Sequence, residues 1–136
     1  MLQKDVLFSL NLKIIQTRPM NTIFYLSTCD TCKRIMKELE PLDGFQLVDI
    51  KADGISEQQL KEMKDLAGSY EALFSRRARL FKERGLKDKA LTEDDYKSLI
   101  LEHYTFLKRP VVLHGNEIFI GNSAKVVAAA KNSIHS

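Results

Sequence analysis

Two cysteines lie three positions apart, in the segment Cys29-Asp30-Thr31-Cys32. A β-branched and aromatic run at residues 22–26 precedes them and predicts a buried strand, and apolar residues at helical spacing follow them. The pair is therefore expected at the N-terminus of a helix, where exposed N–H groups and the helix dipole stabilise a thiolate and lower its pKa. A second thiol at this spacing can attack a mixed disulfide formed by the first. We therefore predict that Cys29 is the nucleophile and Cys32 the resolving thiol.

Two other interpretations of the cysteine pair stay open. A zinc site needs two further ligands, and the three histidines, His103, His114 and His135, are too scattered to supply a ligand pair, so no metal is predicted. Otherwise, the cysteines form a structural disulfide or are two unreactive core thiols. The position of the Cys-x-x-Cys motif between a strand and a helix favours redox chemistry over both interpretations.

Arg109 and Pro110 form a second candidate segment, directly before an apolar run at residues 111–113 that predicts a strand. An X-Pro bond at this position could be cis, whereas the alternative is a trans proline that merely starts an edge strand. Taken by itself, Arg109 is also compatible with an ordinary solvated charge.

The elements around the cysteines predict an α/β fold. A strand at residues 22–26, a helix that ends at Pro41 and a strand at residues 45–50 form a βαβ unit. Such a unit requires parallel pairing of its strands and a right-handed crossover. The sheet then presents Cys29 at its carboxyl edge, which is where open α/β sheets place their functional sites.

A helical block is predicted after the βαβ unit. Ser56 and Gln59 form a capping box at the start of a helix that Gly68 ends. Residues 70–86 are expected to be helical but irregular, and Thr92 caps a further helix.

A β-hairpin and a helix are predicted at the end of the chain. Apolar runs at residues 111–113 and 118–120 flank a turn that contains glycine. Asn122 or Ser123 caps the last helix. The predicted order is therefore β-α-β, a helical block, and β-β-α.

Length and composition limit the class of protein. The chain has 136 residues, 44% hydrophobic and 29% charged, which suffices for the core of one domain but not for two full-sized domains. Two cysteines exclude a disulfide-dense scaffold, and no apolar run reaches the roughly 18 residues of a membrane span, so no membrane contact is expected. Residues 20–136 are expected to form the domain. Residues 1–19 are expected to be an extension, either disordered or an added edge strand. A signal peptide is not expected there, because Asn11 and Lys13 interrupt the apolar stretch that it needs.

Positive charge is concentrated in one segment of the helical block. Residues 76–89 contain seven basic and two acidic residues, a net charge of +5, in a chain whose total is +3. A basic face beside Cys29 would lower its pKa and attract anions, whereas the alternative is a solvated helix face. No recognised nucleic-acid motif accompanies the charge, so no direct nucleic-acid binding is expected.

From about residue 21 to residue 131, the sequence resembles the thioredoxin-like arsenate reductase and Spx family. The matching motifs are the cysteine segment at residues 27–34, the Arg109-Pro110 segment at residues 106–112, and residues 121–123. The resemblance implies a thioredoxin-like fold with an inserted helical block. It also implies that Pro110 is cis and lies against the nucleophile.

Glutaredoxin-dependent arsenate reductases of this family hold an arsenate oxyanion with one cysteine and three arginines. By resemblance, Cys29 is that cysteine, Arg109 is one arginine, and Arg76 or Arg77 is a second. The third arginine is missing, because the hairpin exit at residues 118–122 contains none. This resemblance implies a cytoplasmic thiol–disulfide oxidoreductase without a bound cofactor. By the same resemblance, the expected substrate is a small oxyanion or a disulfide, and Cys32 or glutathione is expected to resolve the intermediate. Glutathione or a dithiol protein such as glutaredoxin or thioredoxin is the expected electron donor.

The Spx branch of the family implies a different function. It shares the Cys-x-x-Cys motif, which oxidises to a disulfide, together with the pattern of residues 75–81 and Gly121 after the hairpin. Spx proteins are redox-switched transcription regulators that bind RNA polymerase. The alternative hypothesis is therefore a non-enzymatic regulator that binds the polymerase α subunit.

Overall fold

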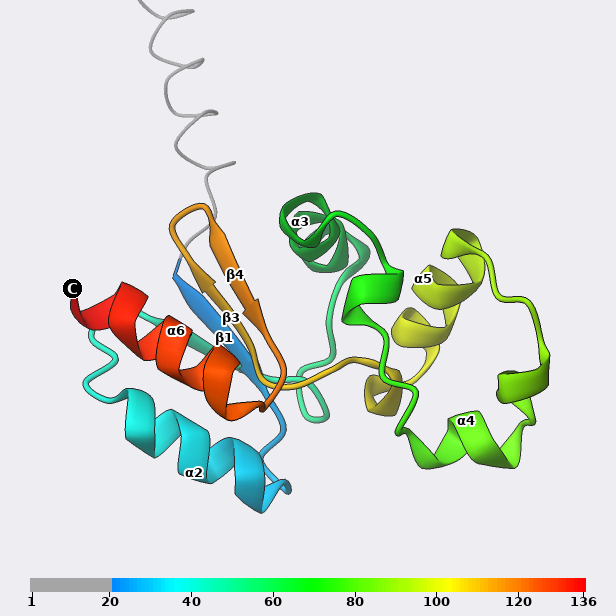
Figure 1. Cartoon of the computed structure of the whole chain (residues 1–136), viewed down its shortest axis with the longest axis horizontal. Helices are drawn as coiled ribbons and strands as arrows, with labels where there is room; N and C mark the ends of the chain where they lie inside the picture. Colours follow the sequence, from blue (N-terminus) through cyan, green and yellow to red (C-terminus); the bar gives the residue numbers. More distant parts are fainter. Residues whose placement is uncertain (1–20) are drawn as a thin grey trace, which may run out of the picture.

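The computed structural model describes residues 21–136, so the predicted N-terminal extension lies outside the described residues. The elements follow the predicted order of βαβ unit, helical block and ββα unit (Figure 1). In this part of the chain no helix has the length and apolar character that a membrane span requires. The α-helices are α2 (Asp30–Leu39), α3 (Glu57–Ala67), α4 (Arg79–Glu83), α5 (Glu93–Glu102) and α6 (Ala124–His135). Short 3₁₀ helices are η1 (Glu71–Leu73), η2 (Leu86–Asp88) and η3 (Tyr104–Phe106).

Residues 21–136 contain a four-stranded mixed sheet with the order β2-β1-β3-β4. The strands are β1 (Thr22–Tyr25), β2 (Gln46–Asp49), β3 (Val111–His114) and β4 (Glu117–Ile120). Strand β1 pairs in parallel with β2 and antiparallel with β3, and β3 pairs antiparallel with β4. The predicted βαβ unit and β-hairpin are therefore both confirmed, and the fold is thioredoxin-like with an inserted helical block.

Alternation along the central strands divides the core between the two faces of the sheet. On β1, Ile23 belongs to a buried cluster with Val112 of β3 and with apolar residues of α2 and α6. The neighbouring Phe24 belongs to a larger buried cluster that extends into the helical block. Helices α2 and α6 thus cover one face, while α3, α4 and α5 lie on the other side (Figure 1). Successive residues of a strand point to opposite faces, which is why one short strand contributes to both clusters.

The inserted block is joined to the segment before β3 by a short antiparallel bridge between Phe74 and Leu107. The Ser75 N–H donates to the Phe106 carbonyl, and the Lys108 N–H donates to the Leu73 carbonyl, both over 2.8 Å. The ring of Phe74 stacks on that of Phe106, with centroids 5.4 Å apart. This seam fixes the residues that follow Phe74 beside those that follow Leu107.

Several predictions for the helical block are confirmed. Ser56 and Gln59 form the capping box of α3, Gly68 ends that helix with a φ of +95°, and Thr92 caps α5. The expected irregular helix over residues 70–86 is much less helical than predicted, since only the five-residue α4 is α-helical there. The reason is that the chain around Phe74 is extended and takes part in the bridge instead.

The sequence predicted either Asn122 or Ser123 as the N-cap of the last helix, α6. Its N-cap is Ser123, whose hydroxyl oxygen accepts from the Val126 N–H at 3.2 Å. Asn122 is therefore the residue before the cap.

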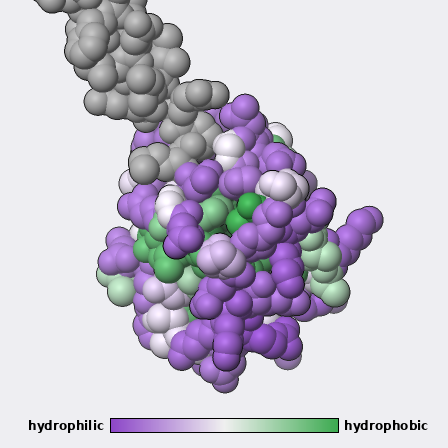
Figure 2. Space-filling view, turned by 90° about the vertical axis from the view of Figure 1, so that its left-hand side faces the viewer, coloured by the Kyte–Doolittle hydropathy of each residue, from purple (hydrophilic) through white to green (hydrophobic). Residues whose placement is uncertain are grey.

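Most large apolar side chains of the described residues are inside. Only Leu47 and Leu101 among them are exposed, by 47% and 36%. The side of the molecule that faces left in Figure 1 is mostly hydrophilic, with one group of hydrophobic residues near its middle (Figure 2).

Candidate functional site

Cys29 is the N-cap residue of α2, at the end of the loop that leaves β1. Its N–H donates to the Leu26 carbonyl at 3.0 Å, and its carbonyl accepts from the Lys33 N–H at 3.2 Å. The loop is also tied to the carboxyl end of β2, because Asp49 accepts from the Ser27 N–H at 3.5 Å. As the N-cap residue, Cys29 has its sulfur beside the first N–H groups of α2, which have no partner within the helix.

The site favours the thiolate form of Cys29. Partial burial raises the pKa of the Cys29 thiol, but hydrogen bonds from the backbone N–H groups of Cys32 and Thr31 and from the Cys32 thiol lower it. The positive charge of Arg109 lowers it further, and the net pKa lies below the ordinary value. This agrees with the expected effect of a helix N-terminus, and it makes Cys29 the better nucleophile of the pair.

Cys32 lies one helical turn into α2 and is fully buried. Burial is the main cause that raises its pKa to about 11, and a charge on the neighbouring Cys29 raises it as well. Both cysteines are free thiols in this structure. The buried thiol therefore donates its hydrogen to Cys29 and is the less reactive of the two thiols.

We expect the two thiols to react with iodoacetamide over different pH ranges. The rate follows the thiolate fraction, so the lowered pKa of Cys29 places its midpoint below that of a free thiol. Cys32, with a pKa of about 11 and no exposure, is expected to stay unmodified in the folded protein at neutral pH. Mass spectrometry of the alkylated peptides against pH measures both. Equal labelling of the two cysteines at pH 7 would contradict this assignment.

A pocket of about 480 Å³ opens beside Cys29. Four of the six predicted site residues line it, namely Cys29, Arg76, Arg77 and Arg109. The other two, Cys32 and Pro110, are buried and are not part of its lining. The seam described above explains this convergence, since it brings the two arginines of the insertion next to the arginine that precedes β3.

Arg109 is held at the pocket by its own backbone neighbourhood. Its Nη1 donates to the carbonyls of Thr105 and Leu107, at 3.4 and 3.3 Å. Its Nε is buried and has no hydrogen-bond partner among the described residues. The Arg109–Pro110 peptide bond is cis, as the resemblance implied, and the Pro110 carbonyl accepts from the Gly121 N–H at 2.9 Å. Arg109 is therefore a positioned guanidinium and not a freely solvated one.

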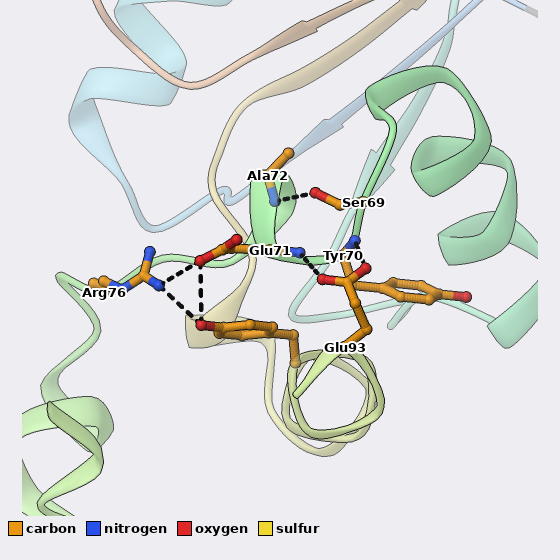
Figure 3. Close-up of polar contacts among 7 residues, drawn as sticks. Ser69, Tyr70, Glu71, Ala72, Arg76 and Glu93 are labelled. Atoms are coloured by element: carbon orange, nitrogen blue, oxygen red, sulfur yellow. Dashed lines mark hydrogen bonds and ion pairs between the residues drawn. The ribbon is translucent and has the colours of Figure 1, made fainter. Parts of the chain in front are cut away.

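Arg76 and Arg77 both line the pocket, but their guanidinium groups differ in their contacts. The Nη2 atom of Arg76 lies 2.9 Å from Glu71 Oε2 and 2.9 Å from the Tyr96 hydroxyl (Figure 3). Arg77 is exposed, and within residues 21–136 its side chain has no hydrogen bond or ion pair. Arg77 is thus the more available of the two for an external anion.

Reasoning from the sequence missed one cation of the pocket. Lys108 lines it and adds a fourth cation, which its place directly before Arg109 could have indicated. Residues 120–123, which lead into α6, also line the pocket, at the hairpin exit where the resemblance places the third arginine. Of the seven basic residues at positions 76–89, only Arg76 and Arg77 line the pocket. The expected basic face beside Cys29 is therefore narrower than the charge count suggested, and Arg109 is the cation that lowers the pKa of Cys29.

The described residues contain no group of three or more histidine, cysteine or acidic side chains that could hold a metal ion. Cys29 and Cys32 therefore have no further protein ligand in this part of the chain with which to form a zinc site.

Three features together define a class of thiol-dependent proteins. They are a thioredoxin-like sheet, a thiol pair at the start of the first helix after β1, and a helical insertion that completes the pocket. The chain belongs to the ArsC family, whose model matches residues 24–130. This is a family of thiol-based oxidoreductases. No curated relative matches the sequence.

Solved structures show the same fold. An arsenate reductase from Vibrio cholerae is similar with a TM-score of 0.68 and 20% identity, over 82% of this chain and 99% of that one. An arsenate reductase (ArsC) related protein from Brucella melitensis has a TM-score of 0.62 and 21% identity, over 82% of this chain and 93% of that one. At these identities the likeness establishes the fold, and the chemistry of this chain has to be argued from its own residues.

Proposed function

We propose that the protein is a thiol–disulfide oxidoreductase that uses Cys29 as its nucleophile on an anionic substrate, with arsenate as the first candidate. The observation that carries the proposal is the pocket beside Cys29, into which three arginines and Lys108 bring positive charge. A thiolate and an anionic substrate repel each other. Cations around the point of attack reduce this repulsion, because they stabilise both negative charges. Cys32, buried behind the nucleophile, supplies the second thiol.

With arsenate the reaction has two steps. The Cys29 thiolate attacks arsenic and displaces one oxygen, which leaves as water after protonation, so that an S–As(V) bond forms. A second thiol, from Cys32 or glutathione, then attacks the Cys29 sulfur. The S–As bond breaks, its electron pair remains on arsenic as arsenite, and the two sulfurs are left as a disulfide that glutathione or a dithiol protein reduces.

A disulfide substrate follows the same geometry. The Cys29 thiolate attacks one sulfur, releases the other as a thiolate and forms a mixed disulfide. Cys32 loses its proton and attacks the Cys29 sulfur, which releases the second thiolate and leaves a Cys29–Cys32 disulfide. Burial, which is the main cause of the raised pKa of Cys32, opposes this loss of a proton.

The test is turnover with arsenate, glutathione and glutaredoxin, run beside a generic disulfide substrate with thioredoxin. Reduction of either substrate that depends on Cys29 supports the proposal. The hairpin exit carries Ile120, Gly121 and Asn122 where the resemblance places the third arginine, so one bidentate donor is missing there. Turnover of disulfides with no arsenate reduction would favour a disulfide as the substrate of this pocket. No turnover of either substrate would refute the enzymatic proposal.

Arg77→Ala is expected to weaken anion-dependent reduction more than Arg76→Ala does. Arg77 has no internal partner to lose, whereas Arg76 is shared with Glu71 and Tyr96. We expect KM for the anion to rise about tenfold in Arg77→Ala, which is the effect of one charged hydrogen bond. Steady-state kinetics of both variants, with Arg79→Ala as a basic control outside the pocket, measures the difference. A larger effect of Arg76→Ala would reverse the assignment.

The regulatory alternative is favoured by one observation. Cys29 and Cys32 are both free thiols in hydrogen-bond contact, so closing a disulfide between them would remove the thiolate from the pocket and change its charge. A pull-down with the RNA polymerase α subunit in reduced and oxidised states tests this Spx-like role. Capture in only one redox state would support it, and capture in neither would count against it.

A further inference from the structure

Arg76 lies at the pocket with one of its donor nitrogens already in contact with a carboxylate of the same chain. Its Nη2 contacts Glu71 Oε2 and the hydroxyl of Tyr96, both at 2.9 Å, and its guanidinium carbon lies 5.7 Å from the centre of the Tyr96 ring. The Tyr96 hydroxyl in turn donates to Glu71 Oε2 at 3.4 Å. Glu71 therefore interacts with Arg76 in the way that the oxygen of an anionic ligand would.

The backbone that carries Glu71 is itself fixed. The carboxylate of Glu93, in the first turn of α5, accepts from the N–H groups of Tyr70 and Glu71 at 2.8 and 3.1 Å (Figure 3). The side chain of Glu71, in contrast, is 54% exposed, and that of Arg76 is 52% exposed. The carboxylate can thus leave Arg76 by rotating into solvent without any change in the segment that holds it.

We propose that Glu71 is an internal competitor for Arg76, which an anion entering the pocket has to displace, so that Glu71 sets the anion affinity of the site. This inference rests on the proposed function only in that the pocket binds anions. An exposed ion pair is weak, because water screens it and two side chains lose freedom. An oxyanion held already by Arg77, Lys108 and Arg109 can therefore take the place of the carboxylate at Arg76.

A competing Glu71 and a merely positioning Glu71 have opposite effects on anion affinity when the charge of the residue is removed. If Glu71 only positioned Arg76, removing its charge would loosen Arg76 and weaken anion binding. If Glu71 competes, Glu71→Gln releases Arg76 and tightens anion binding, by about two- to fivefold for an exposed pair. Tyr96→Phe removes the other contact of Arg76 but keeps the carboxylate, so it is not expected to tighten binding.

The experiment measures protection of Cys29 from iodoacetamide by inorganic sulfate, which does not react with thiols and therefore needs no turnover. The half-protecting sulfate concentration is expected to fall about two- to fivefold in Glu71→Gln relative to the parent protein. Glu83→Gln is the matched control, because Glu83 also pairs with an arginine of the same segment, Arg79 at 3.3 Å, and neither residue lines the pocket. Both variants raise the net charge by one, so only Glu71→Gln should respond.

A second variant tests whether the effect acts through Arg76. Adding Glu71→Gln to Arg76→Ala is expected to leave sulfate protection unchanged relative to Arg76→Ala alone. Thermal unfolding of each variant confirms that it is folded. Weaker or unchanged protection in folded Glu71→Gln, an equal gain in Glu83→Gln, or no protection of the parent protein by sulfate would overturn the inference. Failure of arsenate or disulfide turnover would refute the proposed function and leave this binding result standing.

Discussion

Cys29→Ser is expected to reduce thiol-dependent turnover to the background level, a loss of about a thousandfold or more. Serine has nearly the same shape as cysteine, but its hydroxyl stays protonated at neutral pH and is a far weaker nucleophile than a thiolate. The lowered pKa of the Cys29 thiol, in contrast, favours the thiolate. The measurement is single-turnover and steady-state reduction of arsenate and of a disulfide substrate. Circular dichroism confirms folding, which we expect to be retained because Cys29 is only partly buried.

Cys32→Ser is the matched variant for this prediction. It removes the second thiol and leaves Cys29 in place, so we expect the first covalent adduct still to form and to persist until external glutathione resolves it. Mass spectrometry of the intact protein after a stoichiometric addition of disulfide detects that adduct. Full turnover in Cys29→Ser together with none in Cys32→Ser would exchange the two roles.

Arg109→Ala is expected to have the second-largest effect, a loss of about ten- to a hundredfold in kcat/KM for an anionic substrate. The loss has two causes: the anion loses a positioned charged donor, and Cys29 loses the cation that lowers its pKa. The alkylation midpoint of Cys29 is therefore expected to shift to higher pH, since less positive charge favours the neutral thiol. Kinetics and the alkylation profile of one variant report the two causes separately.

Lys108→Ala separates the position of Arg109 from its charge. Lys108 is exposed at the same pocket and carries the same charge, but Arg109 is anchored by two carbonyls. We expect Lys108→Ala to shift the alkylation midpoint less than Arg109→Ala does. An equal shift in the two variants would mean that total charge near the pocket, and not the placement of Arg109, controls the thiol.

Much of the fold is determined by local patterns, and so it could be predicted from the sequence. The capping box of Ser56 and Gln59, the Thr92 cap and the glycine turn of the hairpin act within a few residues of themselves, and all three are found in the structure. The stretch around Phe74 could not be predicted in this way. Its conformation depends on Leu107, more than thirty positions away, and a long-range bridge here prevails over helical propensity.

The candidate site shows the same division. Cys29 and Cys32 are recognisable because spacing and helix position determine their chemistry. The difference between Arg76 and Arg77 depends instead on whether Glu71 and Tyr96 reach one side chain and not the other, which the sequence alone does not determine. The place of Lys108 directly before Arg109 could have suggested it, but its side chain is known to line the pocket only from the structure.

The seam between the insertion and the segment before β3 also couples the stability of the pocket to the stability of the fold. Amide protons of Ser75 and Lys108 cross it, and the residues that follow them in sequence include the pocket arginines. Slow exchange of those two amides with deuterated solvent would therefore report that the pocket is assembled. A change that loosens the seam acts on chemistry and on folding together, whereas the outer surface of α4 is free to vary without reaching Cys29.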